Sequence, residues 1–199
     1  MIRIERLQGE RLQARIDDLA HLRITVFRGF PYLYDGDMAY EAQYLQTYLD
    51  SPDSVLFAVF DDDKVVGAST AIPLVDEADY VREPFVKAKL NLSQIFYFGE
   101  SVLLPEYRGQ GIGVRFFELR EAAAVQYGSQ FAYFCAVIRP DDHPLKPVGY
   151  RPLHAFWQKR GFAPVSALVS TFSWKDIDET EESPKHLSYW RKSLVATAQ

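Results

Sequence analysis

The sequence has 199 residues, 48% of them hydrophobic, and its 22 basic against 27 acidic side chains leave a formal net charge of −5. Length and composition predict one globular domain, residues 1–199, and exclude a disordered or fibrous chain. The acidic balance argues against a general binder of nucleic acids or anionic membranes, because both need clustered positive charge.

Cysteine content and hydrophobic runs limit the class of protein further. The single Cys135 excludes an internal disulfide and any zinc site built from several cysteines, and we expect a buried structural thiol. The N-terminus lacks the apolar run of a signal peptide, and no segment reaches the roughly 20 apolar residues that span a bilayer. The sequence therefore predicts a cytoplasmic protein.

The first third of the chain predicts one strand and two helices. Residues 2–7 alternate apolar and polar side chains, the period of a half-buried strand. Apolar side chains then recur three or four apart from residue 12 to 26, which predicts a helix that ends near Gly29 and Pro31. Tyrosines and leucines at helical spacing between residues 40 and 49 predict a second helix, closed by Ser51 and Pro52.

The remaining chain alternates predicted strands and helices. Two runs of β-branched and aromatic residues, 55–60 and 65–72, predict an antiparallel hairpin, and a short helix is expected around 85–90. Further strands are expected at 95–104, 131–138, 165–174 and 186–192, and further helices at 111–127 and 153–160. An antiparallel start followed by a β-α-β unit predicts one mixed α/β domain.

The segment that carries chemistry leads from the strand at 95–104 into the helix at 111–127. It reads Leu103-Leu-Pro-Glu-Tyr-Arg-Gly-Gln-Gly-Ile-Gly-Val. Its three glycines allow positive φ angles and leave a surface made of backbone alone. At a helix N-terminus this surface offers unpaired N–H groups and the positive end of the helix dipole, beside the charge of Arg108. The pattern predicts a cradle for a phosphate or pyrophosphate.

Two common phosphate-binding motifs do not fit this segment. A Walker A loop ends in Gly-Lys-Ser/Thr, whereas Val114 and Arg115 follow the last glycine here. A dinucleotide fingerprint needs Gly-x-Gly-x-x-Gly directly after a strand, whereas four residues, Pro-Glu-Tyr-Arg, stand before the glycines here. A nucleotide hydrolase is therefore disfavoured, since no metal-binding aspartate accompanies the glycines either.

The segment resembles motif A of the GNAT N-acetyltransferase superfamily, Arg/Gln-x-x-Gly-x-Gly/Ala, which occurs here as Arg108-Gly-Gln-Gly-Ile-Gly113. A second stretch, Ala155-Phe-Trp-Gln-Lys-Arg-Gly-Phe162, resembles the family's motif B helix, which ends in Gly-Phe. The element order agrees over nearly the whole chain. The resemblance implies the GNAT-like acyl-CoA N-acyltransferase fold, a central mixed sheet flanked by helices, in which strands 4 and 5 splay apart.

The resemblance also implies acetyl-CoA as the cosubstrate, with no metal. The pyrophosphate is expected on the backbone of Arg108, Gly109, Gln110, Gly111, Ile112 and Gly113. The pantetheine amides are expected to pair with Val102, Leu103 and Leu104 like an added strand. A strand N–H is expected to stabilise the tetrahedral oxyanion. Trp157 is expected to pack against the CoA chain or the core.

Glu100 is the candidate general base. It interrupts an otherwise apolar strand where members of the family often carry a carboxylate. A buried carboxylate is costly unless it is paired, so the alternatives to a role on the substrate are that Glu100 points outward or pairs with an arginine such as Arg23 or Arg28. Gly99 beside it is expected to mark a bulge that splays the strand.

The general acid is the point where the sequence departs from the family. Motif B commonly carries a tyrosine four residues before its glycine, which protonates the departing thiolate, and Trp157 stands there instead. An indole has no proton to give at a useful pKa. Tyr150 is the candidate donor; the alternatives are Tyr133, water, or a thiolate that leaves unprotonated.

The aromatic block at 23–37 falls where the fold places the acceptor site. The candidates for substrate contact are Arg28, Tyr32, Tyr34 and Asp35. Aromatic rings with acidic neighbours favour a cage for a cationic amine, whereas the arginines favour the carboxylate of an amino-acid-like acceptor. The rings could equally be the core face of two helices, and the sequence leaves these alternatives open.

These features predict an acetyl-CoA-dependent N-acetyltransferase in which the amine of a small acceptor, amino-acid-like or cationic, attacks the thioester directly. Two alternatives are kept: a CoA-binding sensor or scaffold with little catalysis, and a protein or peptide N-acetyltransferase. The strand at 186–192 is also expected to pair across a homodimer interface.

Overall fold

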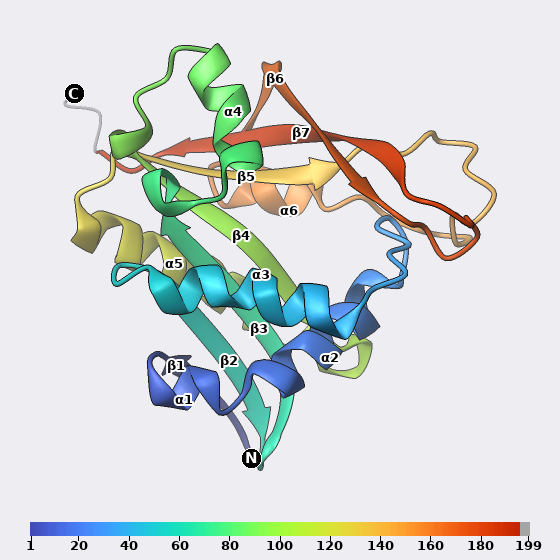
Figure 1. Cartoon of the computed structure of the whole chain (residues 1–199), viewed down its shortest axis with the longest axis horizontal. Helices are drawn as coiled ribbons and strands as arrows, with labels where there is room; N and C mark the ends of the chain where they lie inside the picture. The colour runs from blue at the N-terminus through green and yellow to red at the C-terminus, as the bar shows by residue number, and fades with distance from the viewer. Residues whose placement is uncertain (196–199) are drawn as a thin grey trace.

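A computed structural model describes residues 1–195 as a seven-stranded mixed sheet with helices on both faces (Figure 1). The strands are β1 (Ile2–Leu7), β2 (Val55–Asp61), β3 (Lys64–Pro73), β4 (Ile95–Leu103), β5 (Phe131–Val137), β6 (Ala163–Trp174) and β7 (Ser183–Ser193). The helices are α1 (Glu10–Gln13), α2 (Ile16–Phe27), α3 (Met38–Asp50), α4 (Asp79–Lys87), α5 (Ile112–Tyr127) and α6 (His154–Lys159). Short 3₁₀ turns are η1 (Leu74–Asp76), η2 (Leu92–Gln94) and η3 (Pro105–Tyr107). The predicted class and element order are confirmed; the last four residues of the predicted domain lie outside the described residues.

Two helices differ from their predicted bounds. The helix expected over 12–29 is broken into α1 and α2 at Ala14 and Arg15. The break is invisible to periodicity because Leu12 and Ile16, on either side of it, are both buried at the usual spacing of four. The helix expected at 85–90 is α4, which begins six residues earlier because Val81 and Phe85 bury one face of it.

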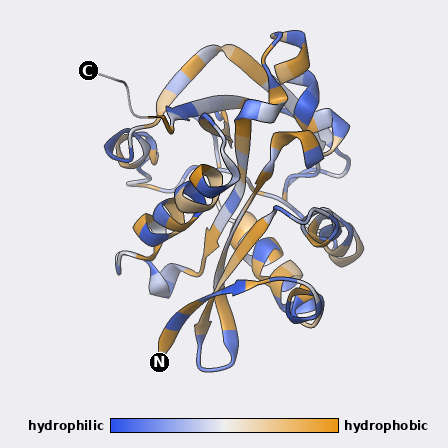
Figure 2. Ribbon diagram, turned by 90° about the vertical axis from the view of Figure 1, so that its left-hand side faces the viewer, coloured by the Kyte–Doolittle hydropathy of each residue, from blue (hydrophilic) through white to orange (hydrophobic). Residues whose placement is uncertain are grey.

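The helices form two layers around the sheet. Helices α1 to α4 cover one face, where Leu19, Leu45 and Phe85 belong to one continuous core. Helices α5 and α6 cover the other face, where Phe117 and Phe134 belong to a second core. Figure 2 shows the apolar residues gathered along the strands and the polar residues on the outer sides of the helices. The sheet is therefore buried on both faces, which explains the near-continuous apolar runs of β2 and β3.

Strands β4 and β5 separate after a short parallel contact. They pair only from Ile95 with Phe131 to Tyr97 with Tyr133. Beyond that point β4 stays beside β3, while β5 stays beside β7. The predicted splay is confirmed, and it leaves one edge of β4 without a neighbouring strand from residue 98 onward.

A β-bulge lies at the start of this separation. Phe98 pairs with Ala71 and Ser101 pairs with Ser69, so Gly99 and Glu100 both stand opposite Thr70. The Thr70 hydroxyl accepts the Glu100 N–H at 3.1 Å. On the α5 face, the Ser69 hydroxyl and Arg120 Nη1 donate to the Glu100 carbonyl at 3.0 and 3.3 Å. The bulge expected at Gly99 is confirmed, and it turns the Glu100 side chain toward α2 and α3.

Strand β7 lies inside the sheet, with β5 on one side and β6 on the other. Both edges of the 186–192 segment are hydrogen-bonded within the chain. The expectation that this strand pairs with a second copy is therefore wrong, because an occupied edge has no backbone groups left to add a strand.

Candidate active site

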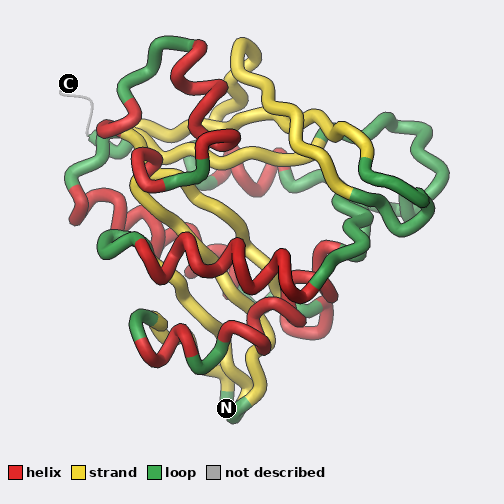
Figure 3. Tube along the Cα trace, viewed as in Figure 1, coloured by secondary structure: helices red, strands yellow, loops and turns green. Residues whose placement is uncertain are grey.

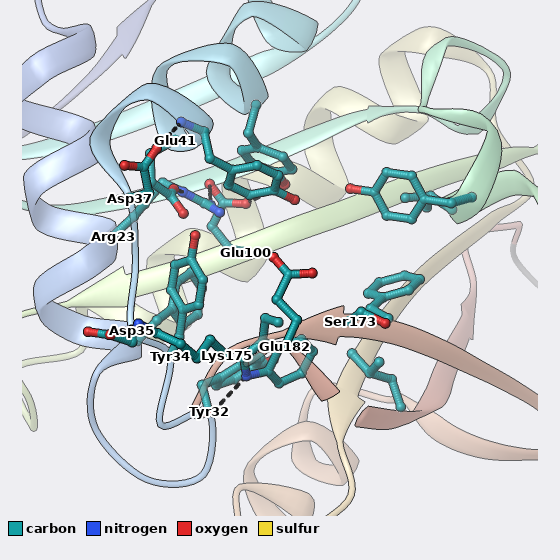
Figure 4. Close-up of a pocket in the computed structure, with 18 of the residues that line it drawn as sticks. Arg23, Tyr32, Tyr34, Asp35, Asp37, Glu41, Glu100, Ser173, Lys175 and Glu182 are labelled. Carbon is teal, nitrogen blue, oxygen red and sulfur yellow. Dashed lines mark hydrogen bonds and ion pairs between the residues drawn. The ribbon is translucent and has the colours of Figure 1, made fainter. Parts of the chain in front are cut away.

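A cavity of about 930 Å³ opens where β4 and β5 separate, on the face covered by α2, α3 and α4. Tyr97, Gly99 and Glu100 of β4 and Cys135 of β5 line it from the sheet. Helices α2 and α3 and the loop between them, together with β6 and the turn that follows it, supply most of the remaining lining (Figure 4). The first and last parts of the chain thus meet at one site.

The lining is acidic and aromatic. It contains seven acidic side chains, two basic ones and nine aromatic rings. The charged residues are Asp35, Asp37, Glu41, Glu77, Glu100, Glu181 and Glu182 on the acidic side and Arg23 and Lys175 on the basic side. Charge pairing and cation–π contact both favour a cationic ligand in such a cavity.

Arg23 of α2 holds two of these carboxylates. Its Nη1 lies 2.6 Å from Oε1 of Glu100, and its Nε pairs with Glu41. The other Glu100 oxygen, Oε2, accepts the Tyr44 hydroxyl at 2.8 Å. The arginine partner expected for Glu100 is Arg23, and all three side chains of this ion-pair network are at most 9% exposed.

Two tyrosine hydroxyls link Glu100 to a second buried carboxyl. Tyr44 Oη lies 3.0 Å from Tyr48 Oη, and Tyr48 Oη lies 3.5 Å from Oε1 of Glu77. Glu77 is 5% exposed, and no ion pair to it occurs among residues 1–195. Burial raises the pKa of Glu77 to about 7, although the Ala78 N–H and the Tyr48 hydroxyl oppose the shift.

This pKa predicts that the folded protein loses stability as the pH rises from about 4.5 to about 7. A carboxyl that holds its proton more tightly when folded stabilises the fold fully below its unfolded pKa, and that contribution is lost as the pH rises through the folded value. Glutamine cannot titrate, so the free energy of unfolding of Glu77→Gln should exceed that of the wild type by about 3 kcal/mol near pH 8 and match it near pH 4.5.

Thermal denaturation of both proteins across this pH range measures the difference. Glu118→Gln, at a carboxyl 55% exposed on α5, is the matched control and should follow the wild type. A difference in stability between Glu77→Gln and the wild type that does not change with pH would contradict the prediction.

Gly99 provides the space for the two tyrosine hydroxyls. A Cβ at this position would lie 2.1 Å from Tyr48 Oη, 2.6 Å from Thr70 Oγ1 and 3.2 Å from Tyr44 Oη. Because Tyr48 is 2% exposed and fixed in the core, Gly99→Ala should cost about 1–3 kcal/mol of unfolding free energy.

Urea denaturation of a double-mutant cycle tests this cause. Tyr48→Phe removes the oxygen that the new methyl group meets, so the double variant should lose less stability than the two single losses added together. Strict additivity would show that the hydroxyl is not what excludes a side chain at residue 99.

The loop between α2 and α3 contributes three of the four predicted substrate contacts. Tyr32, Tyr34 and Asp35 line the cavity, and Arg28 does not. Arg28 pairs with Asp35 at 3.0 Å, and Lys175 of the β6–β7 turn pairs with the same carboxylate at 2.7 Å. The charge of Asp35 is therefore already balanced within the chain.

A buried ionic cluster holds the β6–β7 turn against this loop. Arg139 pairs with Asp176 at 2.7 Å and donates to the carbonyls of Pro31 and Tyr32. Lys185 of β7 lies 3.5 Å from the same Asp176. Figure 3 shows the loop after β5 and the loop after α2 meeting beside the turn that joins β6 and β7.

Glu181 and Glu182 of this turn line the cavity, and Glu182 extends into it (Figure 4). Neither forms an ion pair with any group in the described part of the chain. These two residues therefore add negative charge that the chain does not balance.

The glycine-rich segment forms the expected N–H surface at the start of α5. Gly109 and Gly111 have φ angles of 76° and 82°, with nothing near the place of a Cβ. Within residues 1–195, no backbone N–H from Gly109 to Val114 donates to another residue. Gly113 does not share the positive φ predicted for the three glycines. It lies inside α5, where a Cβ would touch Phe156 of α6 at 3.5 Å.

The free edge of β4 continues from this surface toward the bulge. The N–H of Leu104 donates to the carbonyl of Val66 in β3. By strand alternation, the backbone N–H and C=O groups of Val102 and Leu104 point to β3, and those of Leu103 point to the free edge. The Leu103 carbonyl accepts Arg108 Nε at 3.1 Å. Of the three backbone positions predicted for pantetheine, Leu103 is the one whose polar groups point to the open side.

The predicted acid and the tryptophan of the motif B helix both lie outside the cavity lining. The Tyr150 ring packs edge-on against Phe30, with centroids 4.7 Å apart, and burial raises its pKa. Trp157 packs between Phe134 and Trp190, with centroids 5.0 Å from each. This is the core packing that was one of the two expectations for Trp157.

Cys135 is less buried than expected. It lines the cavity at intermediate exposure, with Sγ 3.0 Å from Tyr97 Oη, and burial raises the pKa of its thiol to about 12. Among the residues that the structure describes, no helix could cross a membrane, and no group of three or more His, Cys, Asp or Glu could hold a metal.

Comparisons with known proteins agree with this geometry. The model of the acetyltransferase (GNAT) family matches residues 19–162. No match was found among the curated proteins. The chain resembles a solved aminoglycoside 6'-N-acetyltransferase in complex with coenzyme A, with a TM-score of 0.63, 16% identity and 99% of each chain covered.

Two further structures show what this fold accommodates. The aminoglycoside 6'-N-acetyltransferase from Enterococcus faecium matches with a TM-score of 0.62, 16% identity and 99% coverage of each chain. The ribosomal-protein-S18-alanine N-acetyltransferase from Escherichia coli matches with a TM-score of 0.59 and 10% identity, over 100% of this chain and 97% of that one. The fold therefore occurs with small-molecule and with protein acceptors.

Proposed function

The chain belongs to the acetyltransferase (GNAT) family, and from this premise we propose that it transfers the acetyl group of acetyl-CoA to an amine of a small acceptor that carries several positive charges. The observation that carries the proposal is the set of unbalanced carboxylates around the cavity where β4 and β5 separate. Asp37, Glu181 and Glu182 have no cationic partner in the described chain.

The cationic side chains of this region are already occupied. Arg23 is shared by Glu41 and Glu100, and Arg28 and Lys175 share Asp35. None of the three is left to bind the carboxylate of an amino-acid-like acceptor without breaking an ion pair. The cationic alternative left open by the sequence is therefore the one we favour.

The proposed reaction uses both faces of the sheet. The pyrophosphate of acetyl-CoA binds the N–H groups between Arg108 and Val114, and the thioester reaches the cavity through the gap beside β4. The acceptor nitrogen attacks the thioester carbonyl carbon, and Glu100 takes a proton from that nitrogen. The C–S bond then breaks and the thiolate leaves with the bonding pair. The proposed donor of the thiolate's proton is Tyr150 or, because Tyr150 lies outside the cavity lining, a water molecule; Trp157 cannot supply it.

The named acceptors of the neighbours support this class of substrate. Aminoglycosides carry several ammonium groups, and two of the matched structures are named for acting on them. At 16% identity these matches establish the fold alone, so the acidic lining has to carry the argument for a polycationic acceptor.

Calorimetry with acetyl-CoA followed by a thiol-release assay tests the proposal. The acceptors would be spermidine, kanamycin, a monoamine, free lysine and a peptide with an N-terminal alanine. We expect thiol release with the polycations, and a KM for them that rises in Glu182→Gln but not in Glu118→Gln. Release with the peptide alone would favour a protein acceptor, and binding without any release would favour a sensor.

A further inference from the structure

Glu77 is a buried carboxyl that the reaction outlined above does not use, although it is connected to Glu100. Four oxygen atoms lie in a row: Glu100 Oε2, Tyr44 Oη, Tyr48 Oη and Glu77 Oε1. The gaps between them are 2.8, 3.0 and 3.5 Å. The first two gaps have the usual length of a hydrogen bond, and the third, at 3.5 Å, is at the outer limit.

Counting protons shows that the row has room for one proton beyond those of the two hydroxyls. The three gaps need three protons, and the two tyrosines supply only two. If both carboxyls are ionised, each tyrosine donates outward and the 3.0 Å contact between the hydroxyls holds no proton. A proton on Glu77 or on Glu100 completes the row, with every donor then pointing the same way.

The row of oxygens is built into the core. Glu77 and Tyr48 are 5% and 2% exposed, and Glu100 is 8% exposed. Gly99 lacks the Cβ that would lie 2.1 Å from Tyr48 Oη. A side chain at residue 99 would therefore displace the central link between the carboxyls.

We propose that Glu100, Tyr44, Tyr48 and Glu77 form one proton relay, in which Glu77 receives, through the two hydroxyls, the proton that Glu100 takes from the acceptor ammonium. The inference rests on the proposed function, because the relay needs an amine to deprotonate. Glu77 acts through Glu100 and is not required to touch the reacting atoms.

The transfer balances without any redox change. An N–H bond of the ammonium breaks, its electron pair stays on nitrogen, and an O–H bond forms on Glu100. Glu100 passes this proton to Tyr44 while Tyr44 passes its own to Tyr48, and Tyr48 passes its own to Glu77. Both tyrosines end neutral. Glu100 is again a carboxylate, ready for the second proton that nitrogen loses once it has attacked the thioester.

The surrounding charges favour this direction. The titratable groups of other elements that interact electrostatically with Glu77 are Tyr44 and Tyr48 of α3, Tyr80 of α4, Tyr97 and Glu100 of β4, Cys135 of β5, Tyr189 of β7 and Arg23 of α2. Arg23 is the only cation among them, and it lies 2.6 Å from Glu100. Arg23 therefore pairs with Glu100 and not with Glu77, so a proton that enters the row at Glu100 comes to rest on Glu77, whose pKa is raised by burial.

Carbon-13 NMR of protein labelled at the glutamate carboxyl tests the coupling without any acceptor. The Glu77 signal is assigned by its loss in Glu77→Gln. We expect a midpoint near 7, a lower midpoint in Glu100→Gln, where a negative charge is removed, and a higher one in Tyr48→Phe, where a donor is removed. Glu118→Gln should leave it unchanged. A midpoint near 4.5, or one unchanged in both relay variants, would overturn the relay.

The kinetic arm uses spermidine as the acceptor. Glu77→Gln, Tyr48→Phe and Tyr44→Phe should each lower kcat about 10- to 100-fold and shift the acid limb of its pH profile, with the Kd of acetyl-CoA within about twofold of the wild type. Tyr127→Phe, at an exposed tyrosine of α5, is the matched control.

Native kcat and pH profile in all three variants would overturn the relay and leave the proposed function standing. A wild type that binds acetyl-CoA but releases no thiol would overturn the proposed function itself, and the relay with it. The two failures are therefore distinguishable.

Discussion

The Glu100→Gln variant is expected to lose about 100- to 10,000-fold in kcat while binding acetyl-CoA as tightly as the wild type. The amide keeps the size of the side chain but cannot accept a proton from the attacking amine. The N–H surface at the start of α5 is on the other face of the sheet and should not change. Steady-state thiol release and calorimetry with acetyl-CoA measure the two quantities separately, and a sensor would show no such split.

The control for Glu100→Gln has to remove an equal amount of buried charge. Glutamine at residue 100 takes one carboxylate from Arg23, which can cost about 3 kcal/mol of stability in a buried pair. Glu41→Gln removes the other carboxylate, at 1% side-chain exposure, and should cost a similar amount. The loss of kcat in Glu41→Gln should be at least about 10-fold smaller than the loss in Glu100→Gln, because Glu41 does not lie on the bulge. Equal losses of kcat in both variants would show that the ion-pair network matters rather than a proton acceptor.

The parts of the site that could be predicted from the sequence are those carried by neighbouring residues. The glycines before α5 predict the N–H surface, because a helix N-terminus and the loop before it are adjacent in the sequence. Gly99 and Glu100 predict the bulge, because a glycine and a charged residue interrupt an otherwise apolar strand. The break between α1 and α2 left no signal, since Leu12 and Ile16 keep their spacing across it.

The parts that could not be predicted depend on pairing across the chain. Glu77 follows a 3₁₀ turn in an irregular segment, and only the fold places it beside Tyr48. Tyr44 and Tyr48 have the spacing of residues on the core face of a helix, so the sequence does not predict the hydrogen bonds that their hydroxyls make. The partner of Glu100 had two candidates in sequence, Arg23 and Arg28. The fold decides between them because Arg23 faces β4 from α2, whereas the side chain of Arg28 is 57% exposed beyond the end of that helix.

The double variant Arg108→Ala/Gly111→Ala is expected to weaken acetyl-CoA binding by about 100-fold or more, or nearly 3 kcal/mol, since a charge-assisted hydrogen bond alone contributes about 1.5–3 kcal/mol. Gly111 caps α5 at φ 82°, a conformation that costs an L residue about 1–2 kcal/mol. Alanine there either strains the loop or turns the N–H groups away from the pyrophosphate. Calorimetric titration with acetyl-CoA measures the loss.

The matched control lies at the other end of the same helix. Gly128 caps the C-terminus of α5 at φ 92°, and nothing lies near the place of its Cβ. Gly128→Ala therefore imposes the same backbone strain without touching the N–H surface, and Arg11→Ala removes an exposed arginine from α1. This control pair should lose stability but keep the Kd of the wild type. If it weakens acetyl-CoA binding as much as Arg108→Ala/Gly111→Ala does, the loss reflects destabilised α5 rather than a lost anion site.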